Sequence, residues 1–202
     1  MKRHQENVLE GCLPLKSYTN KNTTRKHRLL NIAGVVLASA LTAGTAMAAS
    51  PWTSVGSAGV VDEADLSEFY MSAGFAGILL SAPANATVTL RYNVTATADL
   101  ENGGVNKRLS ARFRDNGPGA RVRLYLREYN FLTGVTNTLL TLDSDAVAPS
   151  GSFQTHTVSD GCYSTSFNFS RNAYYVEAIL SRTTASGIPN LAIIRVEDVD
   201  VC

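Results

Sequence analysis

The sequence predicts an all-β protein: a single antiparallel β-sandwich, jelly-roll-like in layout, that follows an N-terminal export signal. Apolar residues alternate with polar ones from residue 81 onward, and turn-forming sequences interrupt this alternation at short intervals. Only residues 62–71 suit a turn or two of helix. The composition, 45% hydrophobic and 17% charged among 202 residues, excludes collagen, coiled coils and disulfide-dense mini-proteins.

Residues 1–48 have the layout of a secretory signal peptide. Basic residues concentrated between positions 21 and 28 precede an apolar run over residues 29–41, and Ala46-Met47-Ala48 follows as a cleavage site. We therefore expect a mature domain over residues 49–202 in the periplasm or outside a bacterial cell. The apolar run is shorter than the roughly 20 residues of a membrane-spanning helix, so we expect no transmembrane segment in the mature chain.

Most of the predicted strands have apolar residues at every second position. In residues 87–97, Val88, Leu90, Tyr92 and Val94 alternate with polar residues, which is typical of a strand with one buried face. Further strands are predicted over residues 109–114, 121–127, 138–145, 174–180 and 191–196, with a shorter apolar pair at Phe167 and Phe169. Turn signals separate them at residues 102–104, 115–119, 133–134, 149–151 and 186–190.

An outer-membrane barrel is an alternative fold for an exported chain with alternating strands. Such a barrel would need strands of about ten residues, an apolar face toward lipid and aromatic girdles at both rims. The sandwich is favoured because the apolar faces are explained as a core and the chain ends in a predicted disulfide.

The charge of the mature chain argues against nucleic acid as a partner. Residues 1–48 hold 7 of the 18 Lys and Arg residues and 2 of the 17 Asp and Glu residues, so their removal changes the net charge from +1 to −4. A general nucleic-acid-binding domain would be basic.

Cleavage also leaves one pair of cysteines. Cys12 lies in the signal segment, which leaves Cys162 and Cys202 in the exported part. Two cysteines in an oxidising compartment predict one disulfide, which would hold the last residue of the chain. A thiolate at Cys162 activated by His156 is the functional alternative, and export argues against it.

The sequence carries little sign of catalysis. It has no G-x-S-x-G elbow, no H-E-x-x-H motif and no glycine-rich phosphate loop, and His156 is the one histidine after residue 48. We therefore predict a protein that is not an enzyme, with a hydrolase as the least favoured alternative.

Acidic residues near both ends of the mature chain suggest a structural calcium ion. The candidates are Asp62, Glu63, Asp65, Asp198 and Asp200, with Glu197 beside the last two. Hard carboxylate oxygens are what Ca²⁺ requires, and sandwich domains often bring their ends together. In this respect the layout resembles jelly-roll carbohydrate-binding modules, and this resemblance implies a Ca²⁺ held by acidic residues from both ends. The alternative is that these carboxylates only keep exposed edges from pairing.

An arginine-rich stretch is the most distinctive feature of the mature chain. Residues 107–127 contain one lysine, six arginines and a single acidic residue, Asp115. If the loop at residues 116–119 joins two strands as a hairpin, the arginines share one face, which could bind sulfate, phosphate or carboxylate groups. The predicted ligand-binding residues are Arg112, Arg114, Arg121, Arg123, Arg127 and Tyr125.

A structural role for part of this stretch is the alternative. A hairpin around residues 132–134 would place Arg123 opposite Asp143 and Arg121 opposite Asp145, unless a bulge at Gly134 shifts the register. Arg112 and Arg114 have no such acidic partner. The function predicted from the sequence is binding or adhesion at the cell exterior, with an anionic polysaccharide or a protein as partner. The alternative is a structural subunit that assembles through edge strands.

Overall fold

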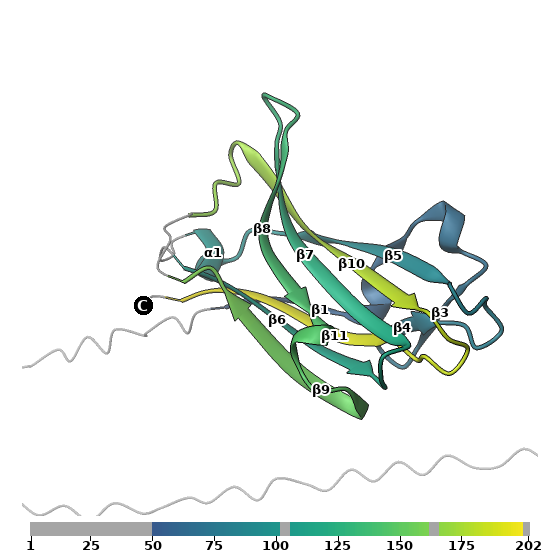
Figure 1. The fold of residues 1–202 in the computed structure, drawn as a ribbon. Coiled ribbons are helices and arrows are strands. Elements are labelled where there is room, and N and C mark those ends of the chain that lie inside the picture. Colours follow the sequence, from purple (N-terminus) through teal and green to yellow (C-terminus); the bar gives the residue numbers. More distant parts are fainter. Residues whose placement is uncertain (1–49, 102–105, 162–165, 200–202) are drawn as a thin grey trace, which may run out of the picture. The chain divides into compact units, whose positions relative to one another are not determined.

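The computed structural model describes residues 50–101, 106–161 and 166–199, and in them two antiparallel sheets pack face to face (Figure 1). Sheet A contains β1 (Trp52–Val55), β3 (Phe69–Ser72), β4 (Phe75–Ile78), β6 (Lys107–Asp115), β9 (Ser150–Ser159) and β11 (Asn190–Asp198). Sheet B contains β2 (Val60–Val61), β5 (Thr87–Val94), β7 (Ala120–Asn130), β8 (Thr136–Asp143) and β10 (Asn172–Arg182). Helical residues form one short helix, α1 (Ala98–Glu101), and 3-10 turns at Gly56–Ala58, Glu63–Asp65 and Ser144–Ala146.

The strand order identifies a jelly roll. Strands β4 to β11 divide equally between the sheets, in the order β4-β11-β6-β9 in sheet A and β5-β10-β7-β8 in sheet B. Among these eight strands, the chain stays within one sheet between β7 and β8 and changes sheet at every other connection. Two four-stranded sheets joined in this way form a jelly roll, so the predicted fold class is confirmed.

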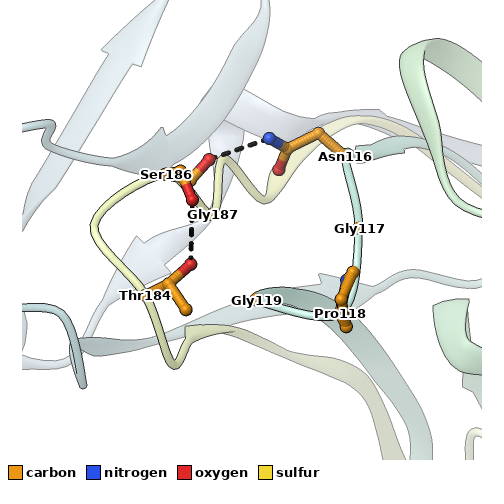
Figure 2. A pocket seen from close by; sticks show the side chains of 7 residues that line it. All are labelled: Asn116, Gly117, Pro118, Gly119, Thr184, Ser186 and Gly187. Atoms are coloured by element: carbon orange, nitrogen blue, oxygen red, sulfur yellow. Dashed lines mark hydrogen bonds between the residues drawn. The ribbon is translucent and has the colours of Figure 1, made fainter.

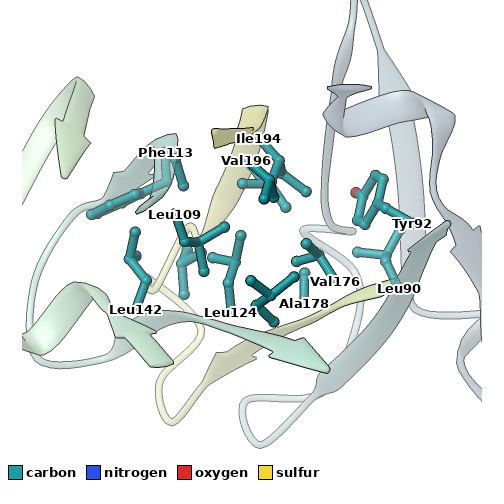
Figure 3. Close-up of a cluster of buried hydrophobic side chains, with 14 of the residues drawn as sticks. Leu90, Tyr92, Leu109, Phe113, Leu124, Leu142, Val176, Ala178, Ile194 and Val196 are labelled. Atoms are coloured by element: carbon teal, nitrogen blue, oxygen red, sulfur yellow. The ribbon is translucent and has the colours of Figure 1, made fainter. Parts of the chain in front are cut away.

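The core lies between the two sheets, where the inward residues of each strand meet. The alternation expected from the sequence places Val88, Leu90, Tyr92 and Val94 of β5 in the interior, all at most 3% exposed. Figure 3 shows residues from both layers in contact, among them Leu124 and Val176 of sheet B. Because most long strands use one face for this core, most polar residues of the two sheets face away from each other. Lys107, Asp115 and Arg182 are exceptions, buried at inward positions of β6 and β10.

The predicted hairpin between the two arginine-rich strands is wrong. β6 pairs with β9 and β11, whereas β7 pairs with β8 and β10, so residues 116–119 cross from sheet A to sheet B. Both strands turn apolar residues toward the core, and their arginines therefore lie on opposite outer faces of the sandwich. The arginine stretch is thus divided into two separate surfaces.

The crossing loop is held by a second loop that joins β10 to β11. Asn116 donates from Nδ2 to the carbonyl of Ser186 at 2.8 Å (Figure 2). It also accepts from the backbone N–H of Ile188 at 2.6 Å. The loops leave a small hollow of about 170 Å³ between them. A Cβ on Gly187 would lie 2.0 Å from the carbonyl oxygen of Gly119, so the loops approach this closely only with glycine.

Several shorter elements were not predicted from the sequence. Strands β1 to β4 and β9 have no clear period-two pattern, and residues 62–71 contain a 3-10 turn followed by β3 rather than a helix of one or two turns. Phe167 and Phe169 precede β10 without forming a strand, and both rings pack on Tyr174. Within the described residues, no helix is long and apolar enough to cross a membrane.

Candidate anion-binding face

The arginines at the start of β7 are neutralised by two aspartates. Arg121 Nε lies 2.9 Å from Asp143 Oδ1 and 2.9 Å from Asp145 Oδ2, and Arg123 Nε lies 3.1 Å from Asp143 Oδ2. The hydrogen bond from Arg121 holds the pKa of Asp143 below its ordinary value. These contacts confirm the predicted structural alternative for this pair of arginines.

The strand register that brings these arginines and aspartates together is the one predicted, because the β-bulge between β7 and β8 lies elsewhere in the pair. Arg123 is directly opposite Asp143, and the pairing shifts by one residue between Leu126 and Arg127, where Leu139 is the extra residue of β8. The shift therefore lies nearer the hairpin turn than the aspartates do. Gly134 adopts a left-handed conformation, φ +69°, within the turn itself.

Arg127 is also paired, although the sequence showed no partner for it. Its Nε and one terminal nitrogen donate to Glu177 Oε2 of β10 at 3.2 and 2.7 Å, and its guanidinium lies 4.5 Å from the centre of the Tyr125 ring. Tyr125 also accepts a hydrogen bond from Arg123 at 3.1 Å. The predicted ligand-binding residues of β7 thus form one network on the outer face of sheet B, in which every arginine contacts a carboxylate.

Arg112 and Arg114 lie on the outer face of sheet A in a different electrostatic setting. Neither forms an ion pair with any carboxylate of the described residues. Arg112 is exposed and stands opposite Thr155 of β9 and Ile193 of β11. The positive charge of these two side chains is therefore not neutralised by the surrounding part of the sheet.

Arg114 is held in place by a neutral group. With the Asn190 amide oriented to satisfy both of its ends, its oxygen accepts from two nitrogens of Arg114 at 2.7 and 3.1 Å, and its nitrogen donates to Tyr70 Oη at 2.7 Å. Asn190 is fully buried, so this contact fixes the guanidinium without cancelling its charge. Gly77 makes room for the network, because a Cβ there would lie 2.2 Å from the Asn190 side chain.

Aromatic rings lie next to the two arginines. Phe75 of β4 and Phe153 of β9 have ring centres 5.7 Å apart, although β11 and β6 separate their strands in the sheet. The two rings therefore meet above those strands on the outer face. The guanidinium carbons of Arg112 and Arg114 lie 6.0 and 5.9 Å from the centre of the Phe153 ring. Tyr70 extends the row, with its ring 5.9 Å from that of Phe75.

Two hollows open on this side of the molecule, each with one of the unpaired arginines in its wall. The larger is about 510 Å³ and is lined by Tyr70, Leu79, Leu80, Ser81, Arg114 and Ile188. The other is about 250 Å³ and includes Arg112, Thr155 and Ile193. We call the surface formed by Tyr70, Phe75, Arg112, Arg114 and Phe153 the sheet A face.

Two of the acidic residues predicted to hold calcium, Asp62 and Asp65, use their carboxylates in contacts with β5. Asp62 lies 3.4 Å from Arg91, and Asp65 accepts from the backbone N–H of Thr89 at 2.7 Å, both on β5. Asp198 contacts Asp99 through its backbone N–H, which donates to Asp99 Oδ2 at 3.1 Å, whereas its own buried Oδ1 has no hydrogen-bond partner among the described residues. Among the residues that the structure describes, no three His, Cys, Asp or Glu side chains gather in a way that could hold a metal ion. Glu63 follows Asp62 in the 3-10 turn, and Asp200 lies outside these residues.

The predicted disulfide cannot be located in the structure, since Cys162 and Cys202 lie outside the described residues. His156 lies on β9 opposite Ala111 of β6 and is half-buried. It lies on the core side of an edge strand of sheet A.

Sequence reasoning found the two arginines of the sheet A face but missed their neighbours. Tyr70, Phe75 and Phe153 belong to short or edge strands without alternation, and Asn190 was assigned to a turn. These residues come from the neighbouring strands β3 and β4 and from β9 and β11, which lie more than 70 positions further along the chain. No local pattern could have joined them.

Comparison with known proteins gives only distant likenesses. No protein-family model matches the chain, and no curated protein matches it. Among solved structures, it is similar to a family 61 carbohydrate-binding module in complex with β-1,4-galactotriose, at 12% identity and a TM-score of 0.38 over 74% of this chain and 88% of that one. A family 35 carbohydrate-binding module from an environmental isolate matches at 20% identity and a TM-score of 0.34, over 75% of this chain and 99% of the other. A family 15 xylan-binding module matches at 12% identity and a TM-score of 0.34, over 71% and 99%. TM-scores this low say nothing about what this chain binds.

Proposed function

We propose that this chain is an exported, non-enzymatic binding protein whose sheet A face binds an acidic polysaccharide. The observation that carries this proposal is the setting of Arg114, which is fixed by the buried, neutral amide of Asn190 instead of a carboxylate. A guanidinium held in this way keeps its charge and its remaining N–H donors for an outside anion.

The rest of the face suits a sugar polymer that carries carboxylate or sulfate groups. Arg112 supplies a second cation, and the rings of Phe75 and Phe153 supply apolar area beside it. The face crosses sheet A in the strand order β3-β4-β11-β6-β9, so successive groups of a polymer could meet successive side chains. Arginines at such sites are stronger anion partners than lysines because they form two parallel hydrogen bonds to one group.

The opposite face supports the assignment by contrast. Arg121, Arg123 and Arg127 each contact a carboxylate at 3.1 Å or less, so a ligand anion would have to displace Asp143 or Glu177. Such exchange gains little free energy, since one anion replaces another. We therefore assign these three arginines to stability and the sheet A pair to binding.

The test compares two single substitutions that remove the same charge from opposite faces. Arg112→Gln should weaken binding to polygalacturonate or heparin by about tenfold or more, because a hydrogen bond to a charged group contributes about 1.5–3 kcal/mol. Arg91→Gln is the matched control: Arg91 is exposed on β5 of sheet B and makes only a 3.4 Å contact with Asp62. It should leave affinity nearly unchanged.

Binding would be measured by isothermal titration calorimetry at two salt concentrations, with unsubstituted dextran as the neutral polymer. Affinity for the anionic polymers should fall as salt rises, since screening weakens exposed charges. Equal affinities of the two variants, or equal binding of dextran and polygalacturonate, would contradict the proposal.

A further inference from the structure

The hairpin that joins β7 to β8 ends in exposed apolar side chains. Figure 1 shows both strands extending beyond the body of the sandwich, so that their turn projects from it. At this turn Phe131 is 57% exposed, Leu132 70% and Val135 51%. Three large apolar side chains exposed within five residues are unusual for a water-facing turn, which ordinarily consists of small and polar residues. We call these three residues the hairpin tip.

The tip is held in a defined conformation. Asn130 Oδ1 accepts from the backbone N–H groups of Leu132 and Thr133 at 3.0 and 3.1 Å, and its carbonyl accepts from Gly134 at 2.8 Å. Gly134 supplies the left-handed conformation that closes the turn. The apolar side chains are thus presented by an ordered loop, which reduces the entropy lost when they bind.

The distribution of charged residues around the hairpin tip indicates which kind of partner the tip could bind. No charged residue occurs between Asn130 and Asn137. Arg171 is the cation beside it: its carbonyl accepts from the backbone N–H of Phe131 at 3.2 Å, its side chain is exposed, and it forms no ion pair with any residue that the structure describes. An uncharged apolar tip with one cation at its base matches the order of layers in an anionic lipid surface, apolar below and negative at the headgroups.

We propose that the hairpin tip inserts into the interface of an anionic lipid membrane, with Arg171 at the level of the headgroups. A projecting loop offers no groove, so a partner must surround it, and a lipid interface does this without a matching pocket. Because the tip belongs to the β7–β8 turn and the sheet A face belongs to the other sheet, membrane contact is independent of the polysaccharide site.

The test measures how the protein sediments with vesicles of phosphatidylcholine and phosphatidylglycerol, compared with vesicles of phosphatidylcholine alone. Leu132→Asp should reduce binding to the anionic vesicles by about tenfold or more, because a carboxylate is strongly disfavoured in the apolar layer. Val60→Asp is the matched control, since Val60 is 72% exposed but lies on β2, at the opposite edge of sheet B from β8. It should bind as the wild type does.

Two further variants separate the tip from the sheet A face. Arg171→Gln should weaken binding to the anionic vesicles and not to neutral ones. Arg112→Gln should leave vesicle binding intact. A wild-type protein that stays in solution with anionic vesicles overturns the proposal. The proposal is also overturned if the Leu132→Asp variant still binds the anionic vesicles and the Arg112→Gln variant does not. In that case the sheet A face would be the lipid-binding surface.

Discussion

Arg114 and Arg121 show how the neighbour of a side chain decides its role. Both are half-buried arginines on outward positions of long strands. Arg121 contacts two carboxylates, whereas Arg114 contacts an amide oxygen. Since exposed ion pairs contribute only about 0–1 kcal/mol each, the first arrangement gives modest stability and little surface charge. The second leaves a fixed positive charge, and that charge is what an anionic ligand needs.

Replacing Asn190 by aspartate tests this difference directly. Asn190→Asp would put a carboxylate where the amide oxygen now meets Arg114, while Tyr70 Oη could donate to the new side chain. We expect the fold to persist and affinity for polygalacturonate to fall by about tenfold or more, because the guanidinium would be neutralised. Titration calorimetry gives the affinity, and circular dichroism follows the fold.

The control for this substitution adds the same charge elsewhere. Asn137→Asp places a carboxylate at an exposed position of β8, on the other sheet. It should change the affinity little. If Asn190→Asp binds as tightly as the wild type, Arg114 has no part in the site.

At the scale of elements, the connections between sheets decide which side chains become neighbours. The loop at residues 116–119 carries the chain from β6 to β7, and the 184–188 loop returns it from β10 to β11. The two loops are joined by Asn116, which hydrogen-bonds Ser186 and Ile188. Arg114 and Asn190 lie at the strand ends next to these loops, so the junction also supports the sheet A face.

Substitution of the glycine at this junction tests how much it contributes. Gly187→Ala should lower the free energy of unfolding by about 1–3 kcal/mol, because its Cβ would lie 2.0 Å from the carbonyl oxygen of Gly119 and would push the loops apart. Chemical denaturation measures the change. Gly151→Ala is the control, since its Cβ would meet nothing within 4 Å, and it should leave stability nearly unchanged. Equal stability of both variants would show that the junction can relax at no cost.

At the scale of the whole molecule, the jelly roll separates three surfaces with different chemistry. The outer face of sheet B carries compensated ion pairs, the sheet A face carries two unpaired arginines beside aromatic rings, and the β7–β8 turn carries the apolar hairpin tip. The first suits stability, and we propose that the other two bind different partners.

The disulfide predicted between Cys162 and Cys202 is a further test at this scale. Protein purified from an exporting host should resist alkylation by iodoacetamide until it is reduced. Cys162→Ser should lower the melting temperature, since closing a loop of roughly 40 residues stabilises a fold by about 4 kcal/mol in the chain-entropy model. Cys202→Ser should have the same effect as Cys162→Ser. Two thiols that alkylate readily in the native protein would rule the bond out.

The order of apolar and polar residues along the chain predicted which side chains of several long strands face the core and which face water. Period-two alternation predicted the inward residues of β5, β6, β7 and β10, and the positions of Asp143 and Asp145 predicted their pairing with Arg123 and Arg121. These relations are local, because they depend on strand geometry and on one hairpin.

Which strands share a sheet could not be predicted from local patterns, because it depends on how the whole chain packs. Residues 116–119 are compatible with a hairpin and with a crossing between layers, and the choice depends on the burial of both apolar faces in one core. The crossing separates Arg112 and Arg114 from the β7 arginines and brings them to Asn190, Phe75 and Phe153 instead. Those contacts join residues about 40 to 80 positions apart, and no pattern along the chain encodes them, because the order of the strands within sheet A sets their distance.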